Sequence, residues 1–173
     1  ENIKDLCDEG SFLETGSLIV AAQRGRRSKE ELIEQTPADG LVAGLARING
    51  DIFAAERSQI LVLGYDYTVL AGTQGAFNHK KTDRLLRQAG KLEAPIVFFV
   101  EGGGGRPGDV DFENISTAGL DLMTFAEFAR LSGKMPRVAI ASGYCFAGNA
   151  ALAGCADVII ATENSSIGMG GPA

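Results

Sequence analysis

Two glycine-containing turns carry the groups in this sequence that are best suited to catalysis. The first, "EGGGGRPGD" at residues 101–109, directly follows the apolar run "PIVFFV". The second lies in "ASGYCFAGNAALAG" at residues 141–154, where we expect a strand to end and a helix of small residues to begin. Amides at a helix N-terminus lack intrahelical acceptors, and glycine lets a ligand approach the backbone closely. Both turns can therefore present N–H groups to a developing negative charge.

The predicted donors are backbone amides. Gly104 or Gly105 supplies one from the first turn, and the pair Ala147 and Gly148 supplies another from the second. Asn149, the next residue, is a candidate contact for a cofactor. If these amides face one point, they form an oxyanion hole. The alternative is that glycine and alanine only allow a helix to pack tightly on a sheet. Two such turns after successive strands favour the oxyanion hole.

The first turn also matches the GxGxxG pattern of dinucleotide-binding loops, through Gly103, Gly105 and Gly108. That pattern requires a helix that opens within it, so that the N-terminus of the helix faces the diphosphate. Here Pro107 lies inside the motif and an acidic run follows it, formed by Asp109, Asp111 and Glu113. Because three carboxylates repel a diphosphate, the pattern disfavours a dinucleotide site.

The elements that position these turns alternate between apolar strands and helices. We expect strands at 41–48, 59–72, 95–100, 137–141 and 157–162, with a tight hairpin at Asn49-Gly50 between the first two. Helices are expected at 78–92, around 119–131 and at 147–154. Apolar strands that alternate with helices predict an α/β fold whose sheet is covered on both faces.

The first forty residues differ from the rest of the chain. Residues 1–40 are expected to form a short helix followed by a mobile charged loop, because "QRGRRSKEELIEQTPADG" at 23–40 has few apolar anchors. Residues 41–173 are expected to form the main domain. The chain is expected to be a piece of a longer polypeptide.

Composition excludes several classes of protein. The 173 residues are 45% hydrophobic and 22% charged, which is typical of a globular protein. A net charge of −6 argues against a nucleic-acid binder. We expect no membrane insertion, because the sequence lacks an apolar run of about 20 residues. Three cysteines without CxxC spacing suggest a reducing compartment such as the cytoplasm, and neither a disulfide framework nor a metal site.

Three stretches taken together resemble a known family. "RVAIASGYCFAGNAALAGCADVIIATENSSIGMGGPA", "PIVFFVEGGGGRPGD" and "YTVLAGTQGAFNHKKTDRLLRQAGKLEAPIV" resemble the carboxyltransferase component of biotin-dependent acyl-CoA carboxylases, in the crotonase superfamily. The resemblance covers about residues 10–173 and the N-terminal half of such an enzyme. It implies a crotonase/Clp-like ββα superhelix, with a mostly parallel sheet flanked by helices.

The resemblance also implies a reaction and its partners. Carboxyl moves from carboxybiotin to the α-carbon of an acyl-CoA through an enolate, which the amides at Gly104 or Gly105 and at Ala147-Gly148 stabilise. The partners are the biotin carboxyl carrier and biotin carboxylase domains, the C-terminal carboxyltransferase half and further copies of the chain, in a homo-oligomer. Ala147 departs from the Gly-Gly common in the family. Ala151 stands where hydratases of the superfamily carry glutamate, which disfavours a hydratase.

Several other residues near the two motifs could contribute to the site, and for the lysines and arginines two interpretations are open. Lys80, Lys81 and Arg84 either contact CoA phosphates or form a charged, solvated helical face. Arg106 either positions a substrate phosphate or stabilises the glycine turn through carbonyl groups. His79, the only histidine, is expected to be a solvated residue at a helix start. Cys145 is expected to be a packed, unreactive thiol.

Three further functions remain as alternatives. One is another acyl-CoA enzyme of the crotonase superfamily, and a second is a non-catalytic assembly half. The third is a serine hydrolase of the Clp-peptidase type, in which Ser142 or Ser116 works with His79 and Asp157. The hydrolase is disfavoured because it needs a nucleophile at the helix start, where this chain has Ala147, Gly148 and Asn149.

Overall fold

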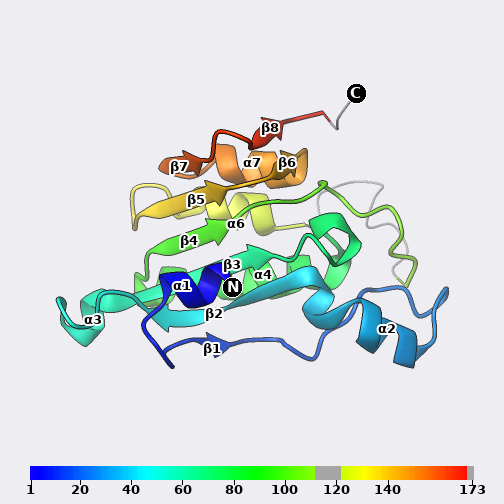
Figure 1. Cartoon of the computed structure of the whole chain (residues 1–173), viewed down its shortest axis with the longest axis horizontal. Helices are drawn as coiled ribbons and strands as arrows, with labels where there is room; N and C mark the ends of the chain where they lie inside the picture. Colours follow the sequence, from blue (N-terminus) through cyan, green and yellow to red (C-terminus); the bar gives the residue numbers. More distant parts are fainter. Residues whose placement is uncertain (112–121, 171–173) are drawn as a thin grey trace.

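A computed structural model describes residues 1–111 and 122–170 of the chain. Its main sheet has six strands in the order β1-β2-β3-β4-β5-β7 (Figure 1). A separate two-stranded sheet pairs β6 with β8. The strands span Leu13–Glu14 (β1), Leu41–Arg47 (β2), Gln59–Tyr65 (β3), Ile96–Phe99 (β4), Arg137–Ala141 (β5), Tyr144–Phe146 (β6), Val158–Ala161 (β7) and Ser166–Gly168 (β8).

The main sheet is mostly parallel. β3, β4, β5 and β7 pair in parallel, whereas β1 and β2 add an antiparallel edge. The helices span Asn2–Leu6 (α1), Lys29–Gln35 (α2), Ala55–Ser58 (α3), Ala76–Leu92 (α4), Thr124–Arg130 (α6) and Gly148–Gly154 (α7). Short 3-10 turns cover Pro37–Gly40 (η1) and Leu70–Gly72 (η2). The predicted α/β class, with a mostly parallel sheet flanked by helices, is confirmed.

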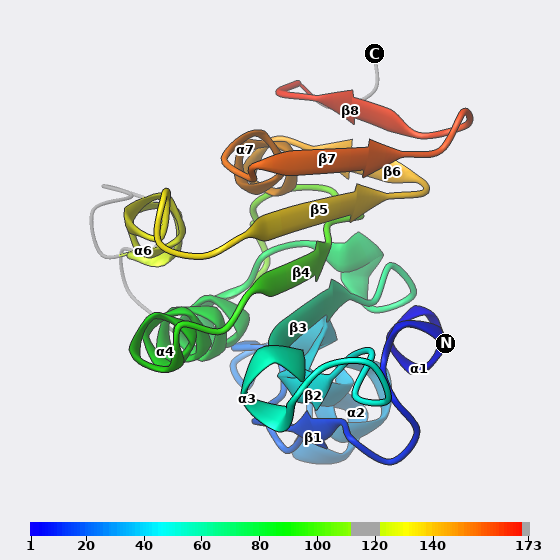
Figure 2. The ribbon, with the colours of Figure 1, turned by 90° about the vertical axis from the view of Figure 1, so that its left-hand side faces the viewer.

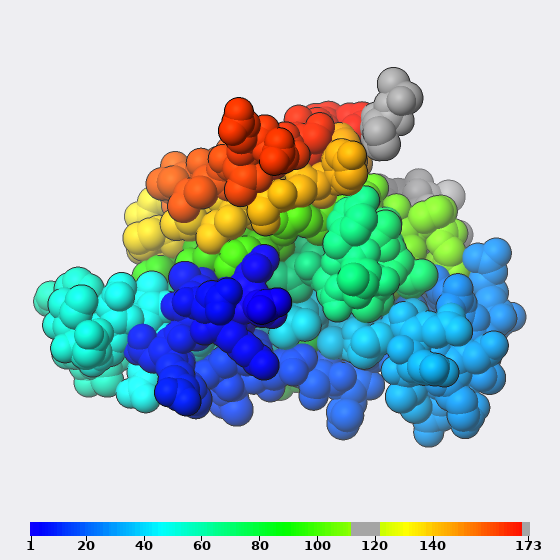
Figure 3. Space-filling model, in the orientation of Figure 1, coloured from blue at the N-terminus to red at the C-terminus, as the bar shows by residue number. Residues whose placement is uncertain are grey.

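Helices cover the two faces of the sheet unequally. Figure 2 shows α4, α6 and α7 along one face and α1 on the other. Leu86 of α4, Phe128 of α6 and Leu152 of α7 are buried with Phe98 of β4 in the main core. A smaller core on the opposite face contains Val62, Val97 and Phe99, and Ile3 and Leu6 of α1 pack against it. In Figure 3 the N-terminal residues, in blue, lie across this second face.

The charged segment at 23–40 is not simply a loop, so that part of the prediction is wrong. It contains α2, whose first turn is closed by a capping box between Ser28 and Glu31. β1, also within the first forty residues, pairs with β2 in the main sheet. The domain boundary placed at residue 40 stays a prediction.

The tight hairpin predicted at Asn49-Gly50 is also wrong. β2 and β3 do pair antiparallel, from Leu41 opposite Tyr65 to Arg47 opposite Gln59. The residues between the strands, however, form a longer connection that includes α3. The Gly50 amide donates to Asp8 Oδ2 at 2.9 Å, and the Ile52 and Phe53 amides donate to the Asn49 carbonyl. These bonds begin a wider turn than a two-residue hairpin allows.

The predicted helices are present with shifted bounds. The helix expected at 78–92 begins two residues earlier, at Ala76, and that expected at 147–154 begins at Gly148. Of the helix expected around 119–131, α6 accounts for Thr124–Arg130. The part before residue 122 lies outside the described residues.

Candidate active site

The two glycine turns lie side by side, because they follow adjacent parallel strands. β4 leads into the first turn and β5 leads through β6 into the second. The Gly102 amide donates to the Tyr144 carbonyl at 2.7 Å, and the Phe146 amide donates to the Gly102 carbonyl at 2.8 Å. Further along, a Cβ placed on Gly104 would lie 2.6 Å from the Ala147 Cβ and 3.5 Å from the Gly148 nitrogen. The tips of the turns are therefore in contact.

The four predicted donors differ in whether their amides have partners. The Gly104 amide donates to Asn149 Oδ1 at 2.9 Å, and the Ala147 amide donates to the Gly168 carbonyl at 2.9 Å. Within residues 1–111 and 122–170, the amides of Gly105 and Gly148 have no hydrogen-bond acceptor. The four candidate donors are therefore reduced to two, the amides of Gly105 and Gly148.

Gln74 determines the direction of the Gly105 amide, and sequence reasoning missed it. The Gln74 amide donates to the Gly104 carbonyl at 2.7 Å, and the Arg106 amide donates to the Gln74 carbonyl at 2.9 Å. In a trans peptide the C=O and N–H point in opposite directions. Because the Gly104 carbonyl points to Gln74, the Gly105 N–H points away from it. The role of Gln74 becomes visible only from its strand-like pairing with the turn. No local pattern around "GTQG" indicates that role.

Close packing requires a glycine at position 148. A Cβ on this residue would lie 2.1 Å from Gln74 Oε1, and the Gln74 side chain is held by a 3.1 Å hydrogen bond from Nε2 to the Tyr65 hydroxyl. The preceding residue, Ala147, has φ of 48° and ψ of −116°. This strained backbone turns the chain from β6 into α7, and Gly148 is the first residue of that helix.

Arg106 is a buried anchor of the first turn. Its guanidinium group contacts the Asp39 carboxylate, and it donates to the Thr73 carbonyl at 2.7 Å and to Thr73 Oγ1 at 3.1 Å. The side chain is 4% exposed. Burial raises the pKa of Asp39, and the nearby guanidinium only partly offsets this. Of the two roles predicted for Arg106, turn stabilisation fits this geometry and phosphate binding does not.

Two of the three acidic residues behind the turn, Asp109 and Asp111, have structural partners, and Glu113 lies outside the described residues. Asp109 accepts hydrogen bonds from the Ala76 amide at 2.8 Å and from Gln23 Nε2 at 3.2 Å. Asp111 accepts from the Arg24 and Gly25 amides at 2.8 and 3.0 Å. These carboxylates therefore tie the first turn to α4 and to the N-terminal segment.

Two of the predicted cofactor contacts, Asn149 and Lys81, are buried in the structure. Asn149 is fully buried, with its side chain bonded to the first turn, so it has no surface to offer a cofactor. Lys81 is also buried, and its ammonium group donates to the carbonyls of Leu41 and Gly16. Burial lowers the pKa of Lys81 to about 8. The solvated face predicted for Lys81 is wrong, whereas Lys80 is exposed.

His79 is not the solvated residue that the sequence suggested. It is 4% exposed, and its Nδ1 lies 2.8 Å from Thr124 Oγ1. The Thr124 hydroxyl donates in turn to the Asp83 carboxylate, so Nδ1 must carry the proton between His79 and Thr124. Burial is the main cause that lowers the pKa of His79 to about 4. The imidazole is therefore neutral near neutral pH.

Cys145 is fully buried, as predicted, and burial raises the pKa of its thiol to about 11. A thiol that stays protonated at neutral pH is a poor nucleophile. The prediction of a packed thiol is confirmed.

A hydrolase triad is not assembled among the described residues. Ser142 Oγ donates to Glu101 Oε1 at 2.6 Å, His79 contacts Thr124, and Asp157 pairs with Arg137 at 2.7 Å. Each proposed member therefore has a different partner. Ser116 lies outside the described residues. In the same described ranges, no cluster of three or more His, Cys, Asp or Glu side chains is arranged to hold a metal ion, and no helix is long and apolar enough to cross a membrane.

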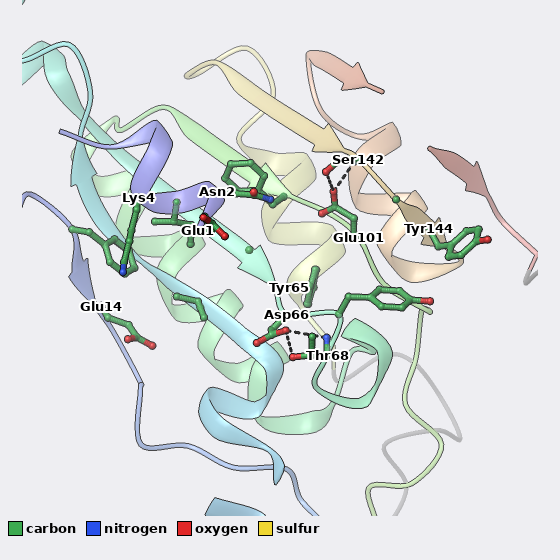
Figure 4. A pocket seen from close by; sticks show the side chains of 17 residues that line it. Glu1, Asn2, Lys4, Glu14, Tyr65, Asp66, Thr68, Glu101, Ser142 and Tyr144 are labelled. Carbon is green, nitrogen blue, oxygen red and sulfur yellow. Dashed lines mark hydrogen bonds between the residues drawn. The ribbon is translucent and has the colours of Figure 1, made fainter. Parts of the chain in front are cut away.

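A cavity of about 810 Å³ opens beside the turns, on the face of the sheet that carries α1 (Figure 4). Tyr65, Glu101, Ser142 and Tyr144 line it at the ends of the central strands. The cavity reaches the residues that begin both turns, but its lining includes neither Gly105 nor Gly148.

Comparisons with known proteins assign this arrangement to a family. The family model of the carboxyl transferase domain matches residues 1–173. The methylmalonyl-CoA carboxyltransferase 12S subunit of Propionibacterium freudenreichii is 30% identical over 99% of this chain and 30% of its own length. The biotin-dependent long chain acyl-coenzyme A carboxylase beta4 subunit of Mycobacterium tuberculosis is 32% identical over 84% of this chain and 24% of its own length.

Solved structures agree with these matches. A single-chain, multi-domain long-chain acyl-CoA carboxylase is 58% identical, with a TM-score of 0.92 over 99% of this chain and 17% of that one. The transcarboxylase 12S hexamer, with hydrolysed methylmalonyl-coenzyme A bound, is 29% identical with a TM-score of 0.77 over 98% of this chain and 30% of that one. This chain spans less than a third of the length of these relatives. The resemblance predicted from the three sequence stretches is confirmed, and the chain belongs to the carboxyl transferase domain family.

Proposed function

We propose that this chain is the N-terminal half of a carboxyltransferase that moves a carboxyl group from carboxybiotin to the α-carbon of an acyl-CoA. The observation that carries the proposal is a pair of amides, those of Gly105 and Gly148, that have no acceptor among the described residues and lie at the touching tips of two turns. Family membership supplies the reaction class.

The chemistry of this donor pair suits an enolate. Loss of a proton from the α-carbon places negative charge on the thioester oxygen, and two N–H groups fixed before the reaction stabilise that charge. A Cβ on Gly105 would meet no atom of residues 1–111 and 122–170 within 4 Å, so these residues leave room for a thioester beside this donor. Carboxybiotin, as the second substrate, supplies the carboxyl group, and the biotin left behind accepts the α-proton. Protein side chains therefore need not act as a base, which agrees with the burial of His79 and with its low pKa of about 4, that of a weak base.

The substrates and partners follow from the relatives. The 58% identical long-chain acyl-CoA carboxylase makes a long-chain acyl-CoA the first substrate to test. We propose that the C-terminal half of a carboxyltransferase completes the site, that the chain works in a homo-oligomer, and that biotin carboxyl carrier and biotin carboxylase domains deliver carboxybiotin. Lys80, exposed on α4, remains the proposed contact for a CoA phosphate. The three free cysteines make the cytoplasm the proposed location.

The test is carboxyl transfer by the full-length protein. Malonyl-CoA, methylmalonyl-CoA and a carboxylated long-chain acyl-CoA are each incubated with biocytin, and the decarboxylated acyl-CoA is measured. We expect turnover with at least one of them. If correctly assembled protein transfers carboxyl from none, the proposal is wrong.

A further inference from the structure

The side chain of Asn149 joins the two candidate donors. Its Oδ1 accepts the Gly104 amide at 2.9 Å, and its Nδ2 donates to the Gly72 carbonyl at 3.4 Å. Gly104 immediately precedes Gly105, and Asn149 immediately follows Gly148. One carboxamide therefore connects the residues next to both donors.

The hydrogen bond from the Gly104 amide to Asn149 Oδ1 runs directly between the tips of the two turns. The backbones of the two turns are bonded to each other at their base, through Gly102 with Tyr144 and Phe146. Beyond that point, in the part of the chain that the structure describes, no backbone hydrogen bond runs between residues 103–106 and residues 147–149. The relative position of the tips depends on the Asn149 side chain, on the contact of Gly104 with Ala147, and on Gln74, whose backbone is bonded to the first turn and whose side chain packs against Gly148.

The packing around Asn149 fixes its conformation. The residue is fully buried, and a Cβ on Gly102 would lie 2.2 Å from Asn149 Nδ2. Gly102 thus leaves the space that the carboxamide fills. The carboxamide is a neutral acceptor, which matters because a carboxylate at this point would repel negative charge that develops between the donors.

We propose that Asn149 is a positioning residue that sets the spacing of the Gly105 and Gly148 amides. The inference rests on the proposed function, and Asn149 itself contacts no substrate. An oxyanion hole works because its donors are in place before the charge develops, and small misplacements of a reacting group lower the rate strongly. The loss should therefore appear in kcat more than in KM.

The first variant is Asn149→Ala in the full-length protein, with Thr36→Ala as the matched control. Thr36 Oγ1 accepts the buried Ala21 amide at 3.0 Å, so its removal also leaves a buried backbone N–H without its acceptor, away from the turns. We expect both variants to lower Tm, but only Asn149→Ala to lower kcat, by about 10- to 100-fold, with KM for the acyl-CoA changed by less than about threefold. A kcat for Asn149→Ala within about threefold of the control would overturn the inference.

Amide hydrogen exchange gives a readout that needs no activity. We expect the Gly104 amide to exchange faster in Asn149→Ala than in wild type and Thr36→Ala. If wild type transfers no carboxyl, the proposed function fails, and exchange still reports whether Asn149 holds the turn. If wild type is active but the Gly104 amide exchanges equally in all three proteins, the inference about Asn149 fails alone.

Asn149→Asp keeps the test decisive if the alanine variant does not fold. It retains an oxygen for the Gly104 amide, so the amide should stay protected from exchange. Its carboxylate should make kcat fall as pH rises through the pKa of the new group, a dependence absent from wild type. A pH profile of kcat that matches wild type, at a wild-type rate, would contradict a role for the neutral carboxamide.

Discussion

The guanidinium group of Arg106 lies against the carboxylate of Asp39, with both side chains almost completely buried. Removing one partner of a buried ion pair leaves an uncompensated charge, which costs about 3–5 kcal/mol. We therefore expect Arg106→Ala to lower the free energy of unfolding by that amount, measured by urea denaturation. Arg130→Ala is the control, because Arg130 is 61% exposed in its pair with Glu127 and should contribute less than about 1 kcal/mol. Equal effects of the two variants would contradict a stabilising role for the Arg106 pair.

Adjacent glycines in the first turn should respond differently to alanine. Gly104 has φ of +87°, and an added Cβ would lie 2.6 Å from the Ala147 Cβ, whereas at Gly105 an added Cβ meets no atom of the described part of the chain within 4 Å. We expect Gly104→Ala to lower the free energy of unfolding by about 1–3 kcal/mol or more and Gly105→Ala to change it by less than about 1 kcal/mol. Thermal unfolding of both variants measures this. Similar losses at the two positions would contradict the different surroundings of Gly104 and Gly105.

His79 should make stability depend on pH. Burial lowers the pKa of His79 to about 4 from an ordinary 6.5, so the unfolded chain binds the proton more readily. The stabilisation is present above about pH 6.5 and is lost as pH falls toward 4, by roughly 3 kcal/mol in total. Urea denaturation at several pH values should therefore show a smaller acid loss in His79→Gln. The opposing contributions of Asp39 and Asp83, whose pKa values are raised by burial, are present in both proteins. Equal acid losses would contradict the burial of His79.

Substitutions of Lys80 and Lys81 should affect different properties, substrate binding for Lys80 and stability for Lys81. Lys80 is exposed, whereas Lys81 is buried with its ammonium group on backbone carbonyls. If Lys80 contacts a CoA phosphate, Lys80→Gln should raise KM for the acyl-CoA several-fold at low salt, with a smaller effect at high salt. Lys81→Gln should instead lower Tm and leave KM unchanged in the folded protein. A KM effect confined to Lys81→Gln would reverse this assignment.

The sequence predicted the parts of the fold that have strong local patterns. The apolar strands at 95–100 and 137–141 and the helix at 78–92 were expected within a few residues, because their burial leaves a clear pattern of side chains. Adjacent parallel strands then bring their following turns together, so the candidate site at Gly105 and Gly148 followed from the order of elements. α2 was missed because its charged sequence has one buried residue, Leu32, and depends on the Ser28 capping box.

The details of the site depend on contacts between distant segments. Gln74 pairs with the glycine turn about thirty residues later, and Asn149 reaches back to Gly104. Lys81 and His79 look like solvated residues in "NHKK", but the segments that cover them come from Gly16, Leu41 and Thr124. No local pattern encodes such pairings. The sequence therefore predicted four candidate amide donors, whereas only two of the four lack an acceptor among the described residues.

The central claim is that the Gly105 amide is a donor in carboxyl transfer, and one pair of variants tests it most directly. Gly105→Pro deletes that N–H, which has no acceptor among the described residues, whereas Gly105→Ala keeps it in a position with room for a methyl group. In full-length protein with unchanged oligomeric state and circular dichroism, kcat for transfer from the carboxylated acyl-CoA to biocytin is measured for both. Removal of an oxyanion donor predicts a loss of about 100-fold or more for Gly105→Pro. Gly105→Ala keeps the N–H but places a methyl group in the space proposed for the thioester, so we expect a clearly smaller loss for it than for Gly105→Pro. A folded Gly105→Pro variant that transfers carboxyl as fast as Gly105→Ala would contradict the claim.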